Sequence, residues 1–138
     1  MIVFLDTNVV LDVLACRDPF FEHSAQVWAL AELGNIRGLV SAVSLTNVYY
    51  IVRKRKSGKE AMNMLRTMRN VMGIVTCDGA VINQAIDADF EDFEDAVQYF
   101  SASAARADVL VTRNVDHYPQ ADVPVMTPKE FLATYSFA

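Results

Sequence analysis

Short apolar runs alternate along the chain with longer segments in which apolar positions recur every three or four residues. The short runs have the length and β-branched composition of buried strands, and they are 2–5, 38–40, 74–76, 109–111 and 123–126. The longer segments have helical periodicity, and they are 9–12, 20–33, 44–56, 58–71, 78–85, 92–106 and 128–132. Strands separated by helices of this length form right-handed βαβ units and a parallel sheet covered on both faces. The pattern therefore predicts a three-layer α/β/α fold with a central parallel five-stranded sheet.

Residues at the ends of these segments support the helical boundaries. Ser44 is predicted to cap the third helix, Gly34 follows the second as a C-terminal cap, and Thr127–Glu130 has the capping-box pattern with proline at the first helical position. Periodicity also places Met62 and Phe93 on core-facing stripes of their helices.

Length and composition predict one globular domain, residues 1–138. Its 138 residues are 53% hydrophobic and 21% charged, and no linker or repeat divides them. The first 13 residues lack a basic flank and no apolar run reaches the roughly 18 residues needed to span a bilayer, so a soluble cytoplasmic protein with no membrane partner is expected. Cys16 and Cys77 have no metal-binding spacing and are predicted to be reduced core thiols.

Charge is distributed unevenly. The net charge of −5 argues against a nucleic-acid partner, but acidic residues gather between 78 and 95, whereas Arg53, Lys54, Arg55 and Lys56 form a basic run. This run has two interpretations. It binds RNA phosphates, or it complements the dipole at the end of a helix and is simply solvated.

Polar side chains follow several of the predicted strands. Asp6 follows the first, Asn114 and Asp116 follow the fourth, and Asn47 lies near the start of the helix after the second. Asp92 and Asp95 share a face at the start of the penultimate helix. If the first and fourth strands are neighbours where the strand order reverses, the crevice between them is flanked by Asp6 and by the loop after strand four.

Carboxylates crowded into such a crevice repel one another unless they are protonated or neutralised. Mg²⁺ is a natural neutraliser because it prefers oxygen ligands and is held by one or two carboxylates together with substrate phosphate. A bound divalent cation supports phosphodiester hydrolysis without a nucleophilic side chain, which suits a chain with no plausible Ser-His-Asp or Cys-His set. Of the two histidines, His23 is expected to be an ordinary polar residue, and His117 is a candidate for substrate contact.

Four blocks of sequence resemble the signature motifs of the PIN domain family. They are Leu5–Asp12, Ser41–Ser44, Phe93–Ala96 and Val111–Asn114, and the resemblance extends over essentially the whole chain to Phe131. It implies a ribonuclease dependent on Mg²⁺ or Mn²⁺, often the toxin of a bacterial toxin–antitoxin pair.

The resemblance also implies roles for individual residues. The family's first acid matches Asp6, and the acid before the small residue of the penultimate helix matches Asp95. The second acid, usually glutamate, falls at Asn47, and the fourth position falls at Asn114. Because amide oxygens bring no charge, Asp92 and Asp116 are expected to compensate as further metal ligands.

A polar shell around these carboxylates is implied at Thr7, Asn8 and Thr112, and Arg113 is implied to reach an RNA phosphate. Each has a structural alternative: Asn8 caps the first helix, and Thr112 reflects β-propensity at a strand end. Of the pair Tyr49 and Tyr50, either a ring stacks on RNA bases, or one ring is core and the other belongs to a dimer surface.

Three functions are compatible with the sequence. The first is a Mg²⁺- or Mn²⁺-dependent endoribonuclease, a homodimeric toxin with an antitoxin partner. The second is a PIN-fold module with a depleted site that binds RNA or protein without cleaving. The third, a phosphatase-like hydrolase with Asp6 as nucleophile, lacks the second acid that it needs two residues later, where the chain has Asn8.

Overall fold

Five parallel strands form one sheet in the computed structural model, which describes residues 1–119 and 122–137. The order across the sheet is β3-β2-β1-β4-β5. The strands are β1 (Ile2–Leu5), β2 (Arg37–Ser41), β3 (Gly73–Val75), β4 (Val109–Val111) and β5 (Val125–Met126). The predicted parallel sheet is confirmed, although the last strand is only half of the predicted 123–126.

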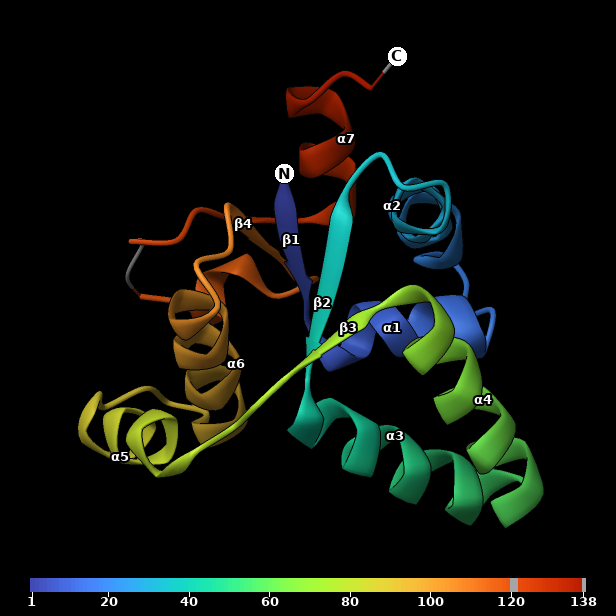
Figure 1. The fold of residues 1–138 in the computed structure, drawn as a ribbon, viewed down its shortest axis with the longest axis horizontal. Helices are drawn as coiled ribbons and strands as arrows, with labels where there is room; N and C mark the ends of the chain where they lie inside the picture. The colour runs from blue at the N-terminus through green and yellow to red at the C-terminus, as the bar shows by residue number, and fades with distance from the viewer. Residues whose placement is uncertain (120–121, 138) are drawn as a thin grey trace.

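Helices cover both faces of this sheet. They are α1 (Thr7–Leu14), α2 (Phe21–Glu32), α3 (Ala42–Arg55), α4 (Gly58–Val71), α5 (Gly79–Asp87), α6 (Phe93–Ala104) and α7 (Pro128–Thr134), with a short 3-10 helix η1 (Val115–His117). Figure 1 shows α5 and α6 on one side of the sheet and α1 to α4 on the other, which confirms the three-layer α/β/α fold. Within the described residues, no helix has both the length and the apolar character that a membrane crossing requires.

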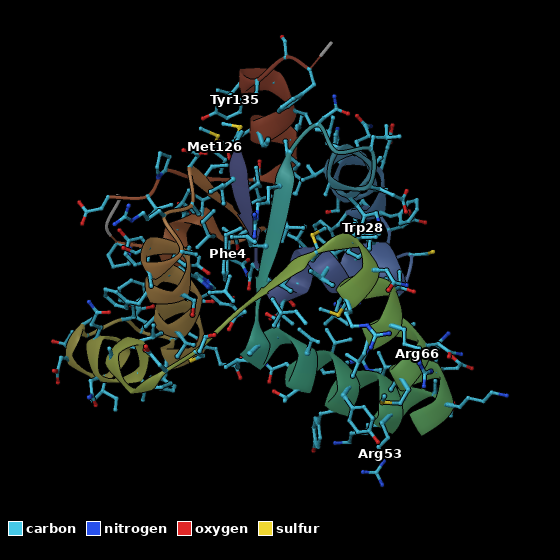
Figure 2. All side chains as sticks on the ribbon, viewed as in Figure 1. Phe4, Trp28, Arg53, Arg66, Met126 and Tyr135 are labelled. Atoms are coloured by element: carbon cyan, nitrogen blue, oxygen red, sulfur yellow. The ribbon has the colours of Figure 1, made fainter. Side chains whose placement is uncertain are left out.

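The core follows from the alternation of side chains along β1. Val3 and Leu5 pack with the larger group of helices, whereas Phe4, between them, packs with Tyr99 and Leu110 on the α6 side. Figure 2 shows Phe4 and Trp28 in these two different layers. Because both faces are buried, β1 is apolar at every position, as expected for a strand in a parallel sheet.

Several predicted helix ends are confirmed. Gly34 adopts a positive φ of 80° directly after the C-cap of α2, a conformation in which glycine carries no steric penalty. Thr127 and Glu130 form the predicted capping box at the start of α7. Ser44 is not a cap, because α3 begins three residues earlier than expected with Ser41 as N-cap, its hydroxyl accepting from the Val43 N–H at 3.1 Å.

Two predicted core positions are exposed instead. Met62 is 41% exposed because Ala61 and Met68 form the buried face of α4, and Phe93 is 49% exposed at the first turn of α6, which buries Ala96 and Val97. Both cysteines are free, but Cys16 is exposed just beyond α1, so the prediction that it is a core thiol is wrong.

Candidate active site at the carboxyl ends of the strands

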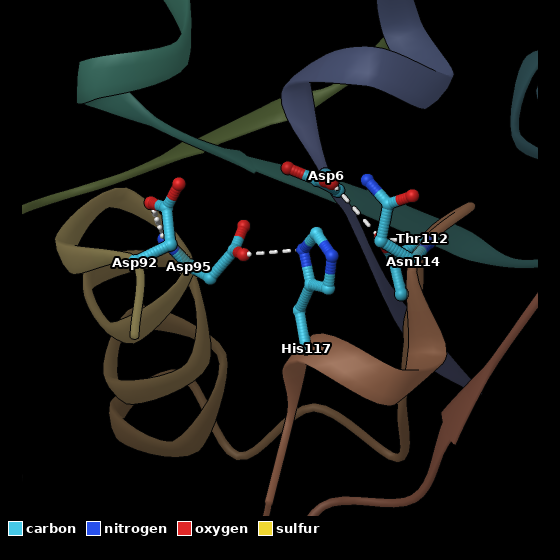
Figure 3. Close-up of polar contacts among 6 residues, drawn as sticks. All are labelled: Asp6, Asp92, Asp95, Thr112, Asn114 and His117. Atoms are coloured by element: carbon cyan, nitrogen blue, oxygen red, sulfur yellow. Dashed lines mark hydrogen bonds and ion pairs between the residues drawn. The ribbon is translucent and has the colours of Figure 1, made fainter. Parts of the chain in front are cut away.

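Strands β1 and β4 lie side by side at the centre of the sheet, where the strand order reverses. This is where open α/β sheets bind ligands. Asp6 directly follows β1, and Thr112 directly follows β4. The Thr112 hydroxyl donates to Asp6 Oδ2 at 2.9 Å (Figure 3). The same hydroxyl accepts from the Asn114 N–H at 3.2 Å. Thr112 therefore joins the two strand ends and orients the Asp6 carboxylate.

Asp6 occupies the N-cap position of α1, but its side chain makes no capping hydrogen bond. The residue is only 4% exposed. Burial and the nearby Asp95 charge raise its pKa from 3.8 to about 6, although the Thr112 hydrogen bond opposes the shift. Asn8 lies inside α1, so it is not the cap of this helix either.

Asp95 lies opposite, in the first turn of α6. Its N–H donates to Asp92 Oδ1 at 3.1 Å, so Asp92 is the N-cap of the helix. Its Oδ2 is 3.1 Å from His117 Nδ1, and Figure 3 shows the two side chains pointing toward one another. Burial and the Asp92 charge raise the pKa of Asp95, and His117 opposes them.

These carboxylates line a cavity of about 370 Å³. Its acidic residues are Asp6, Asp92, Glu94 and Asp95, and its amides are Asn8, Asn47, Gln98 and Asn114. Thr7, Tyr50, Ile51 and His117 complete the lining. The structure thus brings together most of the residues that the sequence suggested, from α1, α3, α6 and the loop after β4.

Two buried side chains near the cavity, Gln98 and Ser44, were not predicted as site residues, and both contact Thr7, which was. Gln98 Nε2 donates to Thr7 Oγ1 and Ser44 Oγ, each at 3.0 Å, and these two hydroxyls are 2.7 Å apart. This network ties α1, α3 and α6 together beneath the carboxylates. The available signal was a glutamine flanked in sequence by Val97 and Tyr99 in a mostly apolar helical segment, because a buried amide needs partners.

Tyr118 was also missed. Its hydroxyl is buried, makes no hydrogen bond with any described residue, and has its pKa raised by burial and by the charges of Asp6 and Asp95. The phenol therefore stays neutral near the two carboxylates, although it does not line the cavity. Nothing in the sequence distinguishes it from an ordinary core tyrosine.

Other predicted residues lie outside the cavity. Asp116 is exposed on η1 and does not contribute to the lining. The Nε of Arg113 is 2.8 Å from Oδ2 of the buried Asp12, and its guanidinium lies 4.0 Å from the centre of the Phe20 ring. In this structure Arg113 is thus engaged by a carboxylate and an aromatic ring, and its role in RNA binding remains a prediction.

The donor set fits a hard divalent cation. Asp6 and Asp95 face one cavity with pKa values raised partly by neighbouring negative charge, so the site favours a positive ligand. Among the described residues no group of three His, Cys, Asp or Glu side chains is placed to hold a metal ion. Mg²⁺ needs fewer protein ligands, because it usually keeps several waters and takes one or two carboxylates.

The raised pKa of Asp6 predicts a specific pH dependence of stability without metal. The native state holds its proton up to about pH 6 while the unfolded chain releases it near 3.8, so the folded state loses stability as pH rises through this window. The expected loss is about 3 kcal/mol. Urea unfolding of wild type and Asp6→Asn in EDTA from pH 4 to 7 measures this loss. The free energy of unfolding of wild type should fall with rising pH relative to that of the variant. A constant difference between them would contradict the raised pKa.

The chain is similar to known proteins over most of its length. A model of the PIN domain matches residues 2–116. Ribonuclease VapC1 of Aquifex aeolicus is 28% identical over 134 residues, covering 94% of this chain and 92% of that protein.

Solved structures share the fold at lower identity. VapBC-1 of nontypeable Haemophilus influenzae has a TM-score of 0.70 at 16% identity, covering 94% of this chain and 99% of that one. DNA-bound VapBC of Salmonella typhimurium has a TM-score of 0.69 at 17% identity, covering 91% and 96%. At these identities the likeness concerns the fold alone. The match of the family model over most of the chain, on a sheet with its carboxylates at the switch point, shows that this protein belongs to the PIN domain family.

Proposed function

We propose that the protein is a metal-dependent endoribonuclease that hydrolyses RNA phosphodiester bonds. The observation that carries the proposal is the pair Asp6 and Asp95, which line one cavity at the carboxyl ends of β1 and β4 in a PIN domain. The similarity to a protein named Ribonuclease VapC1 supports the reaction class.

Asp6 and Asp95 would hold a Mg²⁺ or Mn²⁺ ion, with the amide oxygens of Asn47 and Asn114 as neutral donors and Asp92 at the edge. The bound ion would polarise the phosphoryl oxygen and acidify a water. Thr112 holds Asp6 in orientation, and His117 does the same for Asp95. Thr7 and Asn8, at the start of α1, complete the polar wall. Asp116 could act as a ligand only after a conformational change of the η1 segment, because it does not line the cavity.

The likeness to toxin–antitoxin structures supports a narrower assignment, a cytoplasmic toxin that forms a homodimer and is held by an antitoxin. The basic residues Arg53, Lys54, Arg55 and Lys56 at the end of α3 are exposed and would attract RNA.

The test is incubation of purified, EDTA-stripped protein with mixed RNA, with and without Mn²⁺. We expect cleavage only in the presence of the ion, and its suppression when EDTA is restored. RNA that stays intact at every Mn²⁺ concentration would reject the nuclease and leave the alternative described next.

A second candidate function is a PIN-fold module that binds RNA or protein without cleaving. The observation in its favour is that Asn47 and Asn114, which replace carboxylates expected for the family, both line the cavity. With two neutral donors the site carries less charge for a cation, whose affinity depends on the number of charged ligands.

Asn47→Glu is expected to tighten Mn²⁺ binding by roughly tenfold and to raise cleavage, because it adds a full negative charge to a wall of the cavity. Calorimetric titration of wild type, Asn47→Glu and Asn47→Asp measures the affinity, with the aspartate controlling for side-chain length. If neither acid strengthens binding, Asn47 does not contact the ion.

A further inference from the structure

Helix α3 carries a row of side chains that leads out of the carboxylate cavity. Asn47, Tyr50 and Lys54 are spaced i, i+3 and i+7, which places them along one face of the helix and spans about 10 Å of its axis. Asn47 and Tyr50 line the cavity that contains Asp6 and Asp95. Tyr50 also lines a second pocket, of about 300 Å³, together with Arg53 and Lys54. The Tyr50 ring is therefore the shared wall between the acidic cavity and a basic pocket.

Tyr50 is unusually open for an aromatic residue. The residue is 65% exposed, whereas the neighbouring Tyr49 is partly buried against the core. The Lys54 ammonium lies 5.9 Å from the centre of the Tyr50 ring, so the cation and the ring form one surface. An exposed ring beside positive charge is the arrangement with which proteins bind single-stranded nucleic acid, because bases stack on the ring and phosphates pair with the cations.

The basic run at the end of α3 consists of two pairs of residues with different surroundings. Arg53 and Lys54 lie beside Tyr50, with no carboxylate of the described residues at ion-pair distance. Arg55 and Lys56 line a different pocket, whose walls are largely aliphatic, and Lys56 faces Glu60 at 3.8 Å. The four charges are therefore not equivalent, and only the first pair adjoins the ring that borders the cavity.

We propose that Tyr50, Arg53 and Lys54 form a nucleotide subsite for single-stranded RNA. One base stacks on the Tyr50 ring, and the phosphate beside that base pairs with Arg53 or Lys54. The phosphodiester on the other side of the nucleotide then lies in the cavity at Asp6 and Asp95. Duplex RNA cannot use this subsite because its bases are already stacked on one another. The inference rests on the proposed ribonuclease function and adds the residues that position the substrate.

Binding is measured rather than cleavage, so that failure of the subsite is separable from failure of the nuclease. Fluorescence anisotropy with labelled ten-nucleotide strands is performed in EDTA on the Asp95→Asn background, which prevents the proposed cleavage. Tyr50→Ala is expected to weaken binding of a uridine strand about tenfold or more, as for loss of one stacked base, while Tyr50→Phe stays close to the parent. A strand of abasic sugars should bind both proteins equally, because it has no base to stack.

The charges are tested by two matched double variants. Arg53→Gln with Lys54→Gln should reduce the slope of log affinity against log salt by up to about 1.4, since each lost phosphate contact on a single strand contributes about 0.7. Arg55→Gln with Lys56→Gln removes the same charge from the same helix end and should change the slope much less. Equal effects of the two pairs would overturn the subsite in favour of general electrostatic attraction.

Two further outcomes would also overturn it. If Tyr50→Ala binds the uridine strand as well as its parent does, the subsite is wrong while the nuclease proposal stands on its own cleavage test. If Tyr50→Ala instead converts a dimer to a monomer in light scattering and leaves RNA affinity unchanged, the ring belongs to an interface between copies. RNA binding by none of the proteins would reject the subsite, whereas the nuclease proposal is decided by its own cleavage test with Mn²⁺.

Discussion

Asp6→Asn and Asp95→Asn are each expected to reduce Mn²⁺-dependent RNA cleavage by roughly a hundredfold or more, because each removes a charged oxygen ligand from the proposed ion. Neither change is expected to unfold the protein. An asparagine at position 6 can still accept the Thr112 hydrogen bond, and the N-cap of α6 is made by the Asp92 side chain to the backbone of residue 95. Cleavage of a labelled RNA, followed over Mn²⁺ concentration, measures the effect.

Stability separates this loss of activity from misfolding. Because the folded protein disfavours a charged Asp6, Asp6→Asn should be at least as stable as wild type at pH 7 without metal. Asp87→Asn is the control for charge, since this exposed residue at the end of α5 does not line the cavity. It should cleave like wild type. Wild-type cleavage by either active-site variant would mean that the reaction takes place elsewhere.

The sheet was predictable from sequence because its strands are buried on both faces and therefore read as continuous apolar runs bounded by helical periodicity. The crevice predicted from sequence was conditional on β1 and β4 being neighbours at a switch point, and the observed pairing of Val3 with Val109 meets that condition. Helix α4 begins and ends at the predicted residues, Gly58 and Val71. In these elements the local sequence and the observed burial favour the same structure, so the apolar pattern alone was sufficient to predict them.

The site was less predictable because its supporting contacts join residues that are distant in sequence. The hydrogen bonds from Gln98 to Thr7 and Ser44 span 91 and 54 residues, and no local pattern encodes such a pairing. Ser44 shows the difficulty well. Its type and position suit a helix cap, yet α3 starts earlier and buries the hydroxyl against α1 and α6. A capping residue and a buried network residue are chemically the same until the fold is known.

Arg113 is the clearest case in which the structure suggests a different role from the one that the sequence suggested. Its neighbour Asp12 is fully buried, and the ion pair of 2.8 Å links the loop after β4 to helix α1. Arg17 is a more distant second partner, at 3.8 Å from the other carboxylate oxygen. Burial raises the pKa of Asp12, and the charges of Arg113 and then of Arg17 oppose that shift.

Arg113→Ala is therefore expected to lower the free energy of unfolding by about 3 kcal/mol, the lower end of the range for leaving a buried charge without its partner, because Arg17 remains. Urea denaturation at pH 7 measures this. Asp12→Asn combined with Arg113→Ala should be less destabilised than Arg113→Ala alone, since the unpaired charge is then absent, and Arg113→Lys should be intermediate because it loses the planar contact with Phe20. If Arg113→Ala instead keeps wild-type stability and flattens the salt dependence of RNA binding, Arg113 contacts phosphate, as the family resemblance implied.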